Sequence, residues 1–275
     1  MHQHLDIEFI VIHKMKNIYF HQIDPAVASA SALWALTLVA MPIVGWSIGE
    51  NALYPMIKLG VALQTAAVIT VLVWNAGWRS TLVIALPILL FAWLAEFLGS
   101  TTGFPFGQYS YTLAIQPQLG GVPLLIPFAW LMMLPAAWAV ASSVIRPCSF
   151  PSPWLLRLTR ALVSALAFTS WDLLLDPQMV AWNFWAWSKQ GLYFGIPLTN
   201  FLGWLLVSFV LSLVFCPYHL PEKPLLLIYA VTGLLQFTGQ VFFWGLPGPA
   251  LIGFLGMGGM LVWALLVKKI GSSSD

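Results

Sequence analysis

The chain alternates long apolar stretches with short connections, and this pattern limits its fold more than any other feature. About eight stretches are long enough to cross a hydrocarbon core of ~30 Å, which takes roughly 17–25 helical residues. The predicted spans are 26–45, 57–76, 80–98, 123–145, 158–176, 198–216, 225–244 and 248–267. Only 7% of the residues are charged, and the mean hydropathy is +0.88. We therefore expect an all-α polytopic membrane helix bundle with no second, soluble domain.

Basic residues predict the orientation of this bundle. If the N-terminus is cytoplasmic, the outer segments hold only Lys58 and Lys189. The cytoplasmic segments then hold the other nine of the 11 basic residues, namely Lys14, Lys16, Arg79, Arg146, Arg157, Arg160, Lys223, Lys268 and Lys269. Such an asymmetry favours an even number of spans with both termini in the cytoplasm. The net charge of +2 thus reflects topology and does not indicate a nucleic-acid partner.

The predicted organisation is a single transmembrane domain over residues 25–268 with a tail at each end. Residues 1–24 form a polar cytoplasmic tail, which lacks the apolar core of a signal peptide. Residues 269–275 form a short C-terminal tail on the same side. We expect a multi-pass protein of a cytoplasmic or photosynthetic membrane, in contact with lipid.

Acidic side chains gather toward the outer ends of two spans, and an amide lies at the outer end of a third. Asp172 and Asp176 lie four residues apart, which puts both carboxyls on one helix face. A charge at the centre of a bilayer helix costs ~2.5–3.5 kcal/mol, so two in one apolar run indicate a function. The third span ends at Glu96, and the sixth begins near Asn200. We expect these groups to converge at one depth on the non-cytoplasmic side.

Two connections lie above this level. Residues 99–122 contain no Asp, Glu, Lys, Arg or His, so we expect this loop to lie over the helix ends or to re-enter between them. Residues 177–197 contain three tryptophans, which we interpret as an interfacial belt, namely Trp182, Trp185 and Trp187. Tyr109, Tyr111 and Asn200 are candidate substrate-binding residues, although such residues more often make hydrogen bonds within loops and interfaces.

Histidine and cysteine are found away from the acidic level. A membrane di-iron oxygenase needs clustered histidines, whereas those of this chain lie in the tail or a cytoplasmic loop, namely His2, His4, His13, His21 and His219. Cys148 and Cys216 fall at cytoplasmic helix ends and are interpreted as small hydrophobic residues. No glycine-rich phosphate loop follows a strand, so no nucleotide site is indicated. We expect neither a metal nor another cofactor.

Carboxyls, amides, hydroxyls and aromatic rings therefore remain for chemistry. Two neighbouring carboxyls at low dielectric cannot both ionise easily, so one keeps a proton near neutral pH and the pair titrates as a unit. A neutral acid beside a carboxylate could protonate a carbon–carbon double bond and then deprotonate an incoming water. Aromatic faces would stabilise the intermediate cation by ~2 kcal/mol or more when desolvated. This chemistry is that of a hydratase.

Within this hydratase hypothesis, each acidic residue has an expected role. Asp172, one turn deeper than Asp176, is the expected acid, and either Asp176 or Glu96 is the expected base. Trp171, beside the acid, is a candidate substrate contact. Either aspartate could instead be a structural group, paired with an Asn or Tyr or exposed at a helix end.

Three segments carry a resemblance to a known family. Residues 95–112 (AEFLGSTTGFPFGQYSYT), 171–177 (WDLLLDP) and 193–204 (YFGIPLTNFLGW) resemble the CruF-type carotenoid 1,2-hydratases, integral membrane proteins of carotenoid biosynthesis. The resemblance extends over roughly residues 30–265. It implies addition of water to the terminal 1,2 double bond of an acyclic carotenoid end that is γ-carotene-, lycopene- or bisanhydrobacterioruberin-like. It also allows contacts with other enzymes of a carotenoid pathway.

Two other classes of protein fit parts of the sequence. An intramembrane prenyltransferase could use Asp172 and Asp176 to hold magnesium diphosphate, but the chain has no second aspartate-rich motif, and Lys58 and Lys189 are the only outer cations. A non-catalytic lipid-binding or transport protein could use the carboxyls for proton coupling. The absence of a clear inverted repeat in the sequence weighs against a transporter.

Overall fold

A computed structural model describes residues 24–146, 150–217 and 219–272. Its helices and short strands are α2 (Pro25–Ile48), η1 (Glu50–Ala52), α3 (Leu53–Thr102), β1 (Tyr109–Tyr111), β2 (Gln118–Leu119), β3 (Val122–Pro123), α4 (Leu125–Ile145), α5 (Pro153–Ala181), β4 (Trp185–Trp187), α6 (Leu198–Phe215), α7 (Glu222–Phe242) and α8 (Pro247–Ser272). Within these residues, seven helices are long and apolar enough to cross a membrane. The expected all-α polytopic bundle is confirmed.

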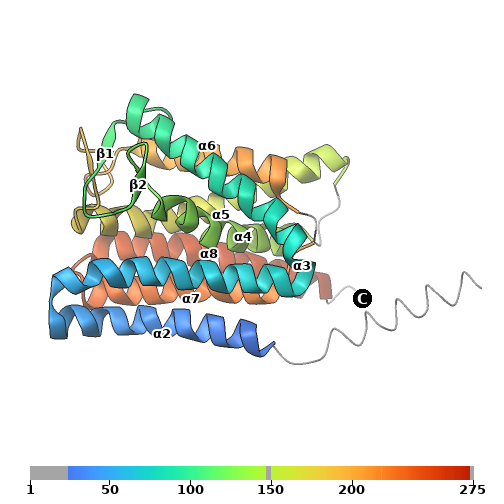
Figure 1. Cartoon of the computed structure of the whole chain (residues 1–275). Coiled ribbons are helices and arrows are strands. Elements are labelled where there is room, and N and C mark those ends of the chain that lie inside the picture. The colour runs from blue at the N-terminus through green and yellow to red at the C-terminus, as the bar shows by residue number, and fades with distance from the viewer. Residues whose placement is uncertain (1–23, 147–149, 218, 273–275) are drawn as a thin grey trace, which may run out of the picture.

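The longest helix, α3, consists of two antiparallel halves. Gly77 interrupts it with φ 78° and ψ 162°, a backbone conformation that a residue with a Cβ rarely adopts. The chain turns back at this point (Figure 1). The halves match the predicted spans 57–76 and 80–98, and each is as long as a membrane crossing. The count of eight spans and the cytoplasmic side stay predictions.

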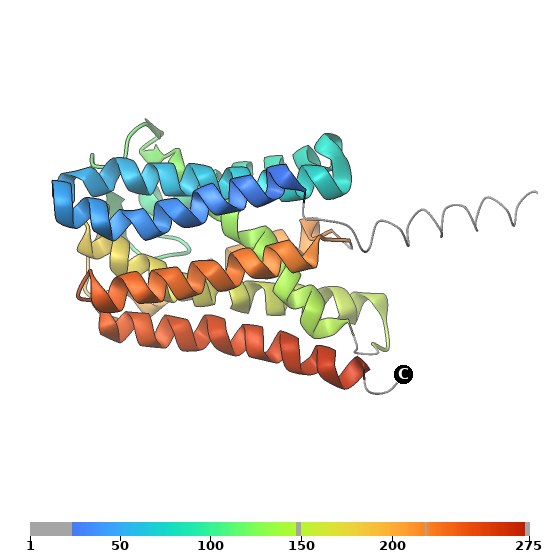
Figure 2. The same ribbon diagram turned by 90° about the horizontal axis from the view of Figure 1, so that it is seen from below.

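Both ends of the described chain lie at the same end of the bundle. α2 starts at Pro25 on the side where α8 ends at Ser272 (Figure 1). Figure 2 shows α7 between the hairpin of α2 and the first half of α3 on one side and α8 on the other. Apart from Asp24, the predicted N-terminal tail lies outside the described residues; at the other end, residues 269–272 are still helical.

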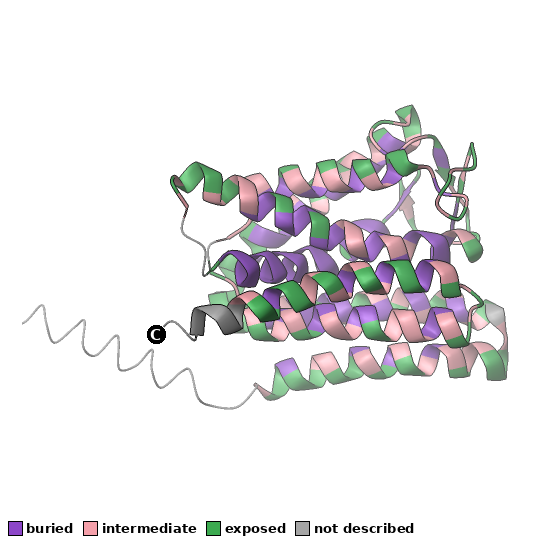
Figure 3. Cartoon of the chain, turned by 180° about the vertical axis from the view of Figure 1, so that it is seen from behind, coloured by how far each residue is buried: buried purple, intermediate pink, exposed green. Residues whose placement is uncertain are grey.

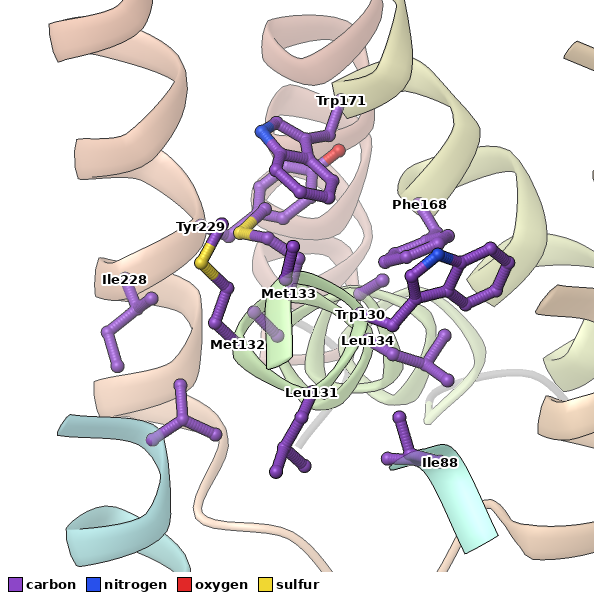
Figure 4. Packing of buried hydrophobic residues seen from close by; sticks show 14 of the residues in the cluster. Ile88, Trp130, Leu131, Met132, Met133, Leu134, Phe168, Trp171, Ile228 and Tyr229 are labelled. Atoms are coloured by element: carbon purple, nitrogen blue, oxygen red, sulfur yellow. The ribbon is translucent and has the colours of Figure 1, made fainter. Parts of the chain in front are cut away.

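The centre of the bundle is α4. Its surface is apolar all round, as in a helix enclosed by protein. In its apolar 18-residue segment, 89% of the residues are buried. In Figure 4 its side chains point toward the surrounding helices, and Trp130 lies beside Phe168 of α5 at a ring distance of 4.8 Å. The outer helices differ, because α2 and α8 present exposed leucines and isoleucines on their outer faces (Figure 3). These faces suit contact with lipid.

Helix α5 continues through Pro177 to Ala181, past the predicted end of the span at residue 176. A proline inside a helix removes the N–H that would bind the carbonyl four residues earlier. Here the Tyr193 hydroxyl donates to that carbonyl, on Leu173, at 3.0 Å. The helix therefore keeps its acceptor satisfied, and Asp176 stays inside the bundle at 1% exposure.

The long connections fold over the end of the bundle that is opposite the described chain ends. β1 pairs antiparallel with β4, with Tyr109 opposite Trp187 and Tyr111 opposite Trp185. β2 and β3 form a second short ribbon within residues 118–123. The uncharged loop thus lies over the helix ends, as predicted (Figure 1).

Candidate active site

Acidic groups of two helices and an amide of a third meet beneath the β1–β4 ribbon. Glu96 comes from α3, Asp172 and Asp176 come from α5, and all three are buried. Asn200, in the first turn of α6, joins the two aspartates because its Nδ2 donates to Asp172 Oδ2 at 2.8 Å and to Asp176 Oδ2 at 2.6 Å. Both carboxyls therefore lie on one face of α5, and the groups converge as predicted, while the side of the membrane stays a prediction.

Glu96 is held by two tyrosine hydroxyls. Tyr109 and Tyr111 are two residues apart in β1, so their side chains point to the same face of the ribbon. Their hydroxyls donate to Glu96 Oε2 at 2.5 and 2.7 Å. Burial raises the pKa of both tyrosine hydroxyls above the usual value for tyrosine, and the nearby charge of Glu96 is the second cause. Both phenols therefore remain protonated hydrogen-bond donors to the carboxylate.

Two of the tryptophans assigned to an interfacial belt belong instead to this site. Trp185 is 6% exposed, and its indole N–H donates to Asp176 Oδ1. Trp187, two residues on and on the same ribbon face, packs against Tyr109 at a ring distance of 5.1 Å. The belt interpretation is wrong for both, because pairing with β1 turns their rings toward the helices.

These groups enclose a small chamber. Carboxyl, amide and hydroxyl groups share its wall with aromatic rings. Its lining residues are Glu96, Phe106, Tyr109, Tyr111, Ile126, Ala129, Leu175, Asp176, Trp185, Trp187, Asn200 and Trp204. Asp172 is not among them but is hydrogen-bonded to Asn200, which is. The chamber thus combines proton donors and acceptors with π-faces that can stabilise a cation.

A second, larger hollow adjoins the chamber. It lies between α2, the first half of α3, α4, α5 and α7, and its wall is mostly apolar. Four residues line both hollows, and the wall that they share is called the junction here, namely Ile126, Ala129, Leu175 and Trp185. Trp171 lines this apolar cavity instead of the chamber, and its indole donates to Gln236 Oε1 at 2.9 Å.

The match to known proteins covers this site. A family model described as "Carotenoid biosynthesis protein" matches residues 56–259, which is most of the chain and includes all four polar residues of the three helices. The chain belongs to the carotenoid biosynthesis protein family.

A curated relative narrows the comparison. The bisanhydrobacterioruberin hydratase of Haloarcula japonica is 31% identical over 127 residues, which are 46% of this chain and 41% of that relative. The chain therefore matches less than half of the relative's length. No solved structure matches this member of the carotenoid biosynthesis family.

Residues predicted to lie far from the acids do so where the structure describes them. His219 and Cys216 lie where α6 connects to α7, at the opposite end of the bundle. His2, His4, His13, His21 and Cys148 lie outside the described residues. Among the residues described, no three His, Cys, Asp or Glu side chains form a group that could hold a metal.

Sequence reasoning missed the tryptophans around the chamber. Trp130, on α4, is buried near Glu96, and its ring stacks on that of Trp204 at 4.8 Å. Trp130 stands beside no polar motif, so packing alone reveals it, whereas Trp204 ends the 193–204 segment one helical turn after Asn200. For Trp185 and Trp187 a signal existed, because Trp-Ala-Trp repeats the alternation of Tyr-Ser-Tyr at 109–111.

Proposed function

We propose that this protein is a carotenoid hydratase, which adds water to the terminal 1,2 double bond of an acyclic carotenoid end to give a tertiary 1-hydroxy group. The observation that carries the proposal is the junction between the acidic chamber and the apolar cavity. An apolar chain held in the cavity would present its end to three carboxyls. The family and the name of the Haloarcula relative support the same reaction.

The chemistry requires one acid and one base. The alkene π electrons form a C–H bond at the less substituted carbon, C2, with a proton from the aspartate pair, which leaves a tertiary cation at C1. A water lone pair then forms the C–O bond, and Glu96 takes the surplus proton. Return of that proton to the aspartate pair completes the cycle, so the net change is one water added. No redox cofactor takes part.

Hydrogen bonds suggest where the proton of the pair resides. Asp176 accepts N–H groups from both Trp185 and Asn200, and each donor stabilises a carboxylate. Asp172 accepts from Asn200 alone, and its Oδ1 is buried without a partner among the described residues. An unpaired buried oxygen costs less on a neutral acid than on an anion. We therefore assign the stored proton to Asp172, with Asp176 as the member of the pair that contacts substrate.

The remaining walls suit a cationic intermediate. Trp185, Trp187 and Trp204 line the chamber, and an aromatic face is worth ~2 kcal/mol or more to a desolvated cation. Glu96 faces the same space with two phenol donors fixing its orientation. A fixed carboxylate can accept the proton of a bound water as the C–O bond forms.

The same hydrogen bonds weigh against a magnesium-dependent prenyltransferase. Mg²⁺ is held by oxygen lone pairs in near-octahedral geometry. Here the N–H groups of Asn200 and Trp185 are aimed at the lone pairs of the two aspartates. A metal would have to displace these donors.

The proposal is tested by expressing the protein in bacteria that make acyclic carotenoids. The pigments are separated and their masses are measured by mass spectrometry. We expect pigments heavier by one or two waters, carrying tertiary hydroxyls, and much less of them from cells that make Asp176→Asn at equal membrane abundance. Retained but unaltered pigment would favour a binding or transport protein, and prenylated pigment that depends on magnesium would favour a prenyltransferase.

A further inference from the structure

The apolar cavity contains amide groups that the proposed reaction does not use. Gln64 of α3 and Gln178 of α5 both line it, and they are 3% and 4% exposed. A buried polar group without a hydrogen bond is costly, and more so at membrane depth. The orientation of each amide follows from its neighbours and defines what the cavity can bind.

The orientation of Gln178 follows from an indole. Trp171 can only donate, so Gln236 turns its oxygen toward the indole and its NH2 toward Gln178. The oxygen of Gln178 accepts this NH2 at 3.2 Å and that of Gln240 at 3.0 Å. The NH2 of Gln178 therefore points elsewhere, and among the described residues no acceptor bonds to it.

Gln64 is oriented by a hydroxyl in the same way. Thr232 donates its only proton to the carbonyl of Ile228 at 2.8 Å, so its oxygen can only accept. Gln64 satisfies it by turning its NH2 to Thr232 at 3.0 Å, and the same NH2 reaches the sulfur of Met133 at 3.1 Å. Within the described part of the chain, the carbonyl oxygen of Gln64 has no hydrogen-bond donor.

Among the described residues, the cavity thus offers an unused donor group, the NH2 of Gln178, and an unused acceptor, the carbonyl oxygen of Gln64. A pure hydrocarbon chain can satisfy neither. A hydroxyl group can accept from the first and donate to the second, and it is neutral, so it enters an apolar cavity without the penalty of a charge. We propose that Gln64 and Gln178 recognise a hydroxyl carried by the polyene substrate at a distance from its reacting end.

This inference rests on the proposed function, since it takes the cavity as the binding site of the carotenoid chain. Gln178 follows Asp176 by two residues on α5 but faces the cavity instead of the chamber. The recognised hydroxyl therefore belongs to the part of the chain just outside the junction. The preferred substrate is an oxygenated carotenoid with one intact dimethyl-alkene end.

The test uses purified protein and a series of acyclic carotenoids that carry one hydroxyl at increasing distance from an intact end, with the unsubstituted hydrocarbon as reference. We expect the wild type to prefer one hydroxylated member. Gln178→Met and Gln64→Met should each reduce that preference roughly three- to tenfold, the effect of one lost hydrogen bond. In each variant, the loss of hydration of the hydroxylated member should exceed the loss with the hydrocarbon.

Leu235→Ala is the matched control, because Leu235 lines the same cavity without a polar group and its truncation should alter all substrates alike. Equal rates of the wild type on every member of the series would overturn the hydroxyl site and leave the hydratase intact. Equal losses of rate on all members of the series in both glutamine variants would also overturn the hydroxyl site and leave the hydratase intact. Failure of the wild type on every member would instead contradict the hydratase itself.

Discussion

Trp185 donates its indole N–H to Asp176, although one residue lies in a surface ribbon and the other inside a membrane helix. This bond makes the ribbon part of the acidic site. It also holds a ring at the junction of the cavity and the chamber, where the reacting end of a polyene would pass. The connection after α5 is therefore part of the candidate catalytic machinery.

Replacing Trp185 with phenylalanine keeps an aromatic wall and removes the N–H. We expect Trp185→Phe to lower hydration roughly tenfold, because one oxygen of a buried carboxylate loses its donor. Hydration rate per inserted protein is the measurement. Trp154→Phe, at an exposed position at the start of α5, is the control and should be neutral. Unchanged activity of Trp185→Phe would show that this hydrogen bond has no part in catalysis.

Single amide replacements separate the roles of the three carboxyls. Asp172→Asn keeps the shape but cannot store the proton, so we expect hydration to fall by ~10²–10⁴-fold while the protein still inserts and retains carotenoid. Asp176→Asn and Glu96→Gln should also slow turnover. Rates and retained pigment should be compared at equal membrane abundance. Near-normal hydration by well-expressed Asp172→Asn would assign the proton to Asp176 or Glu96 instead.

The junction predicts a variant that binds substrate without converting it. Ala129, on α4, lines both hollows, and a large ring there would fill the passage. We expect Ala129→Trp to reduce hydration about tenfold or more, since the reacting end no longer reaches the acids. Pigment should still be retained in the cavity. Ala32→Trp, on the exposed face of α2, adds the same volume outside the bundle and should hydrate normally. Normal turnover by Ala129→Trp would mean that substrate enters the chamber by another route.

Membrane orientation is tested by cysteine labelling in a background free of Cys148 and Cys216. Ser110 is exposed in the β1–β4 ribbon, and Pro151 is exposed at the opposite end of the bundle. The excess of basic residues at the latter end predicts that Ser110→Cys reacts with an impermeant reagent from outside and Pro151→Cys only from the cytoplasm. The reverse labelling pattern would show that the protein has the opposite orientation in the membrane.

Apolar length and the spacing of the acids were sufficient to predict the helices and the convergence of Glu96, Asp172, Asp176 and Asn200. Both signals are local, because a span is set by consecutive apolar residues and a helix face by a spacing of four. The lack of charge in the 99–122 loop predicts that it lies over the helix ends or re-enters between them, and the structure shows the first of these placements.

Long-range packing could not be predicted in the same way. The continuation of α5 past Pro177 depends on a hydroxyl from Tyr193, sixteen residues later. The role of Trp185 depends on pairing between two strands about 75 residues apart, and tryptophan near a membrane surface is ordinarily a belt residue. The orientation of Gln178 is set by a chain of amides from another helix. Each of these needs the assembled bundle.

In the proposed reaction, water supplies the new hydroxyl oxygen through carboxyl chemistry. The direct measurement is single-turnover conversion of an acyclic carotenoid by purified protein, under strict exclusion of oxygen, in isotope-labelled water. We predict full incorporation of labelled oxygen into the tertiary alcohol, with no requirement for iron or a reductant, and loss of the reaction in Asp172→Asn. A hydroxyl that forms only when molecular oxygen is admitted, and carries its label, would contradict the account.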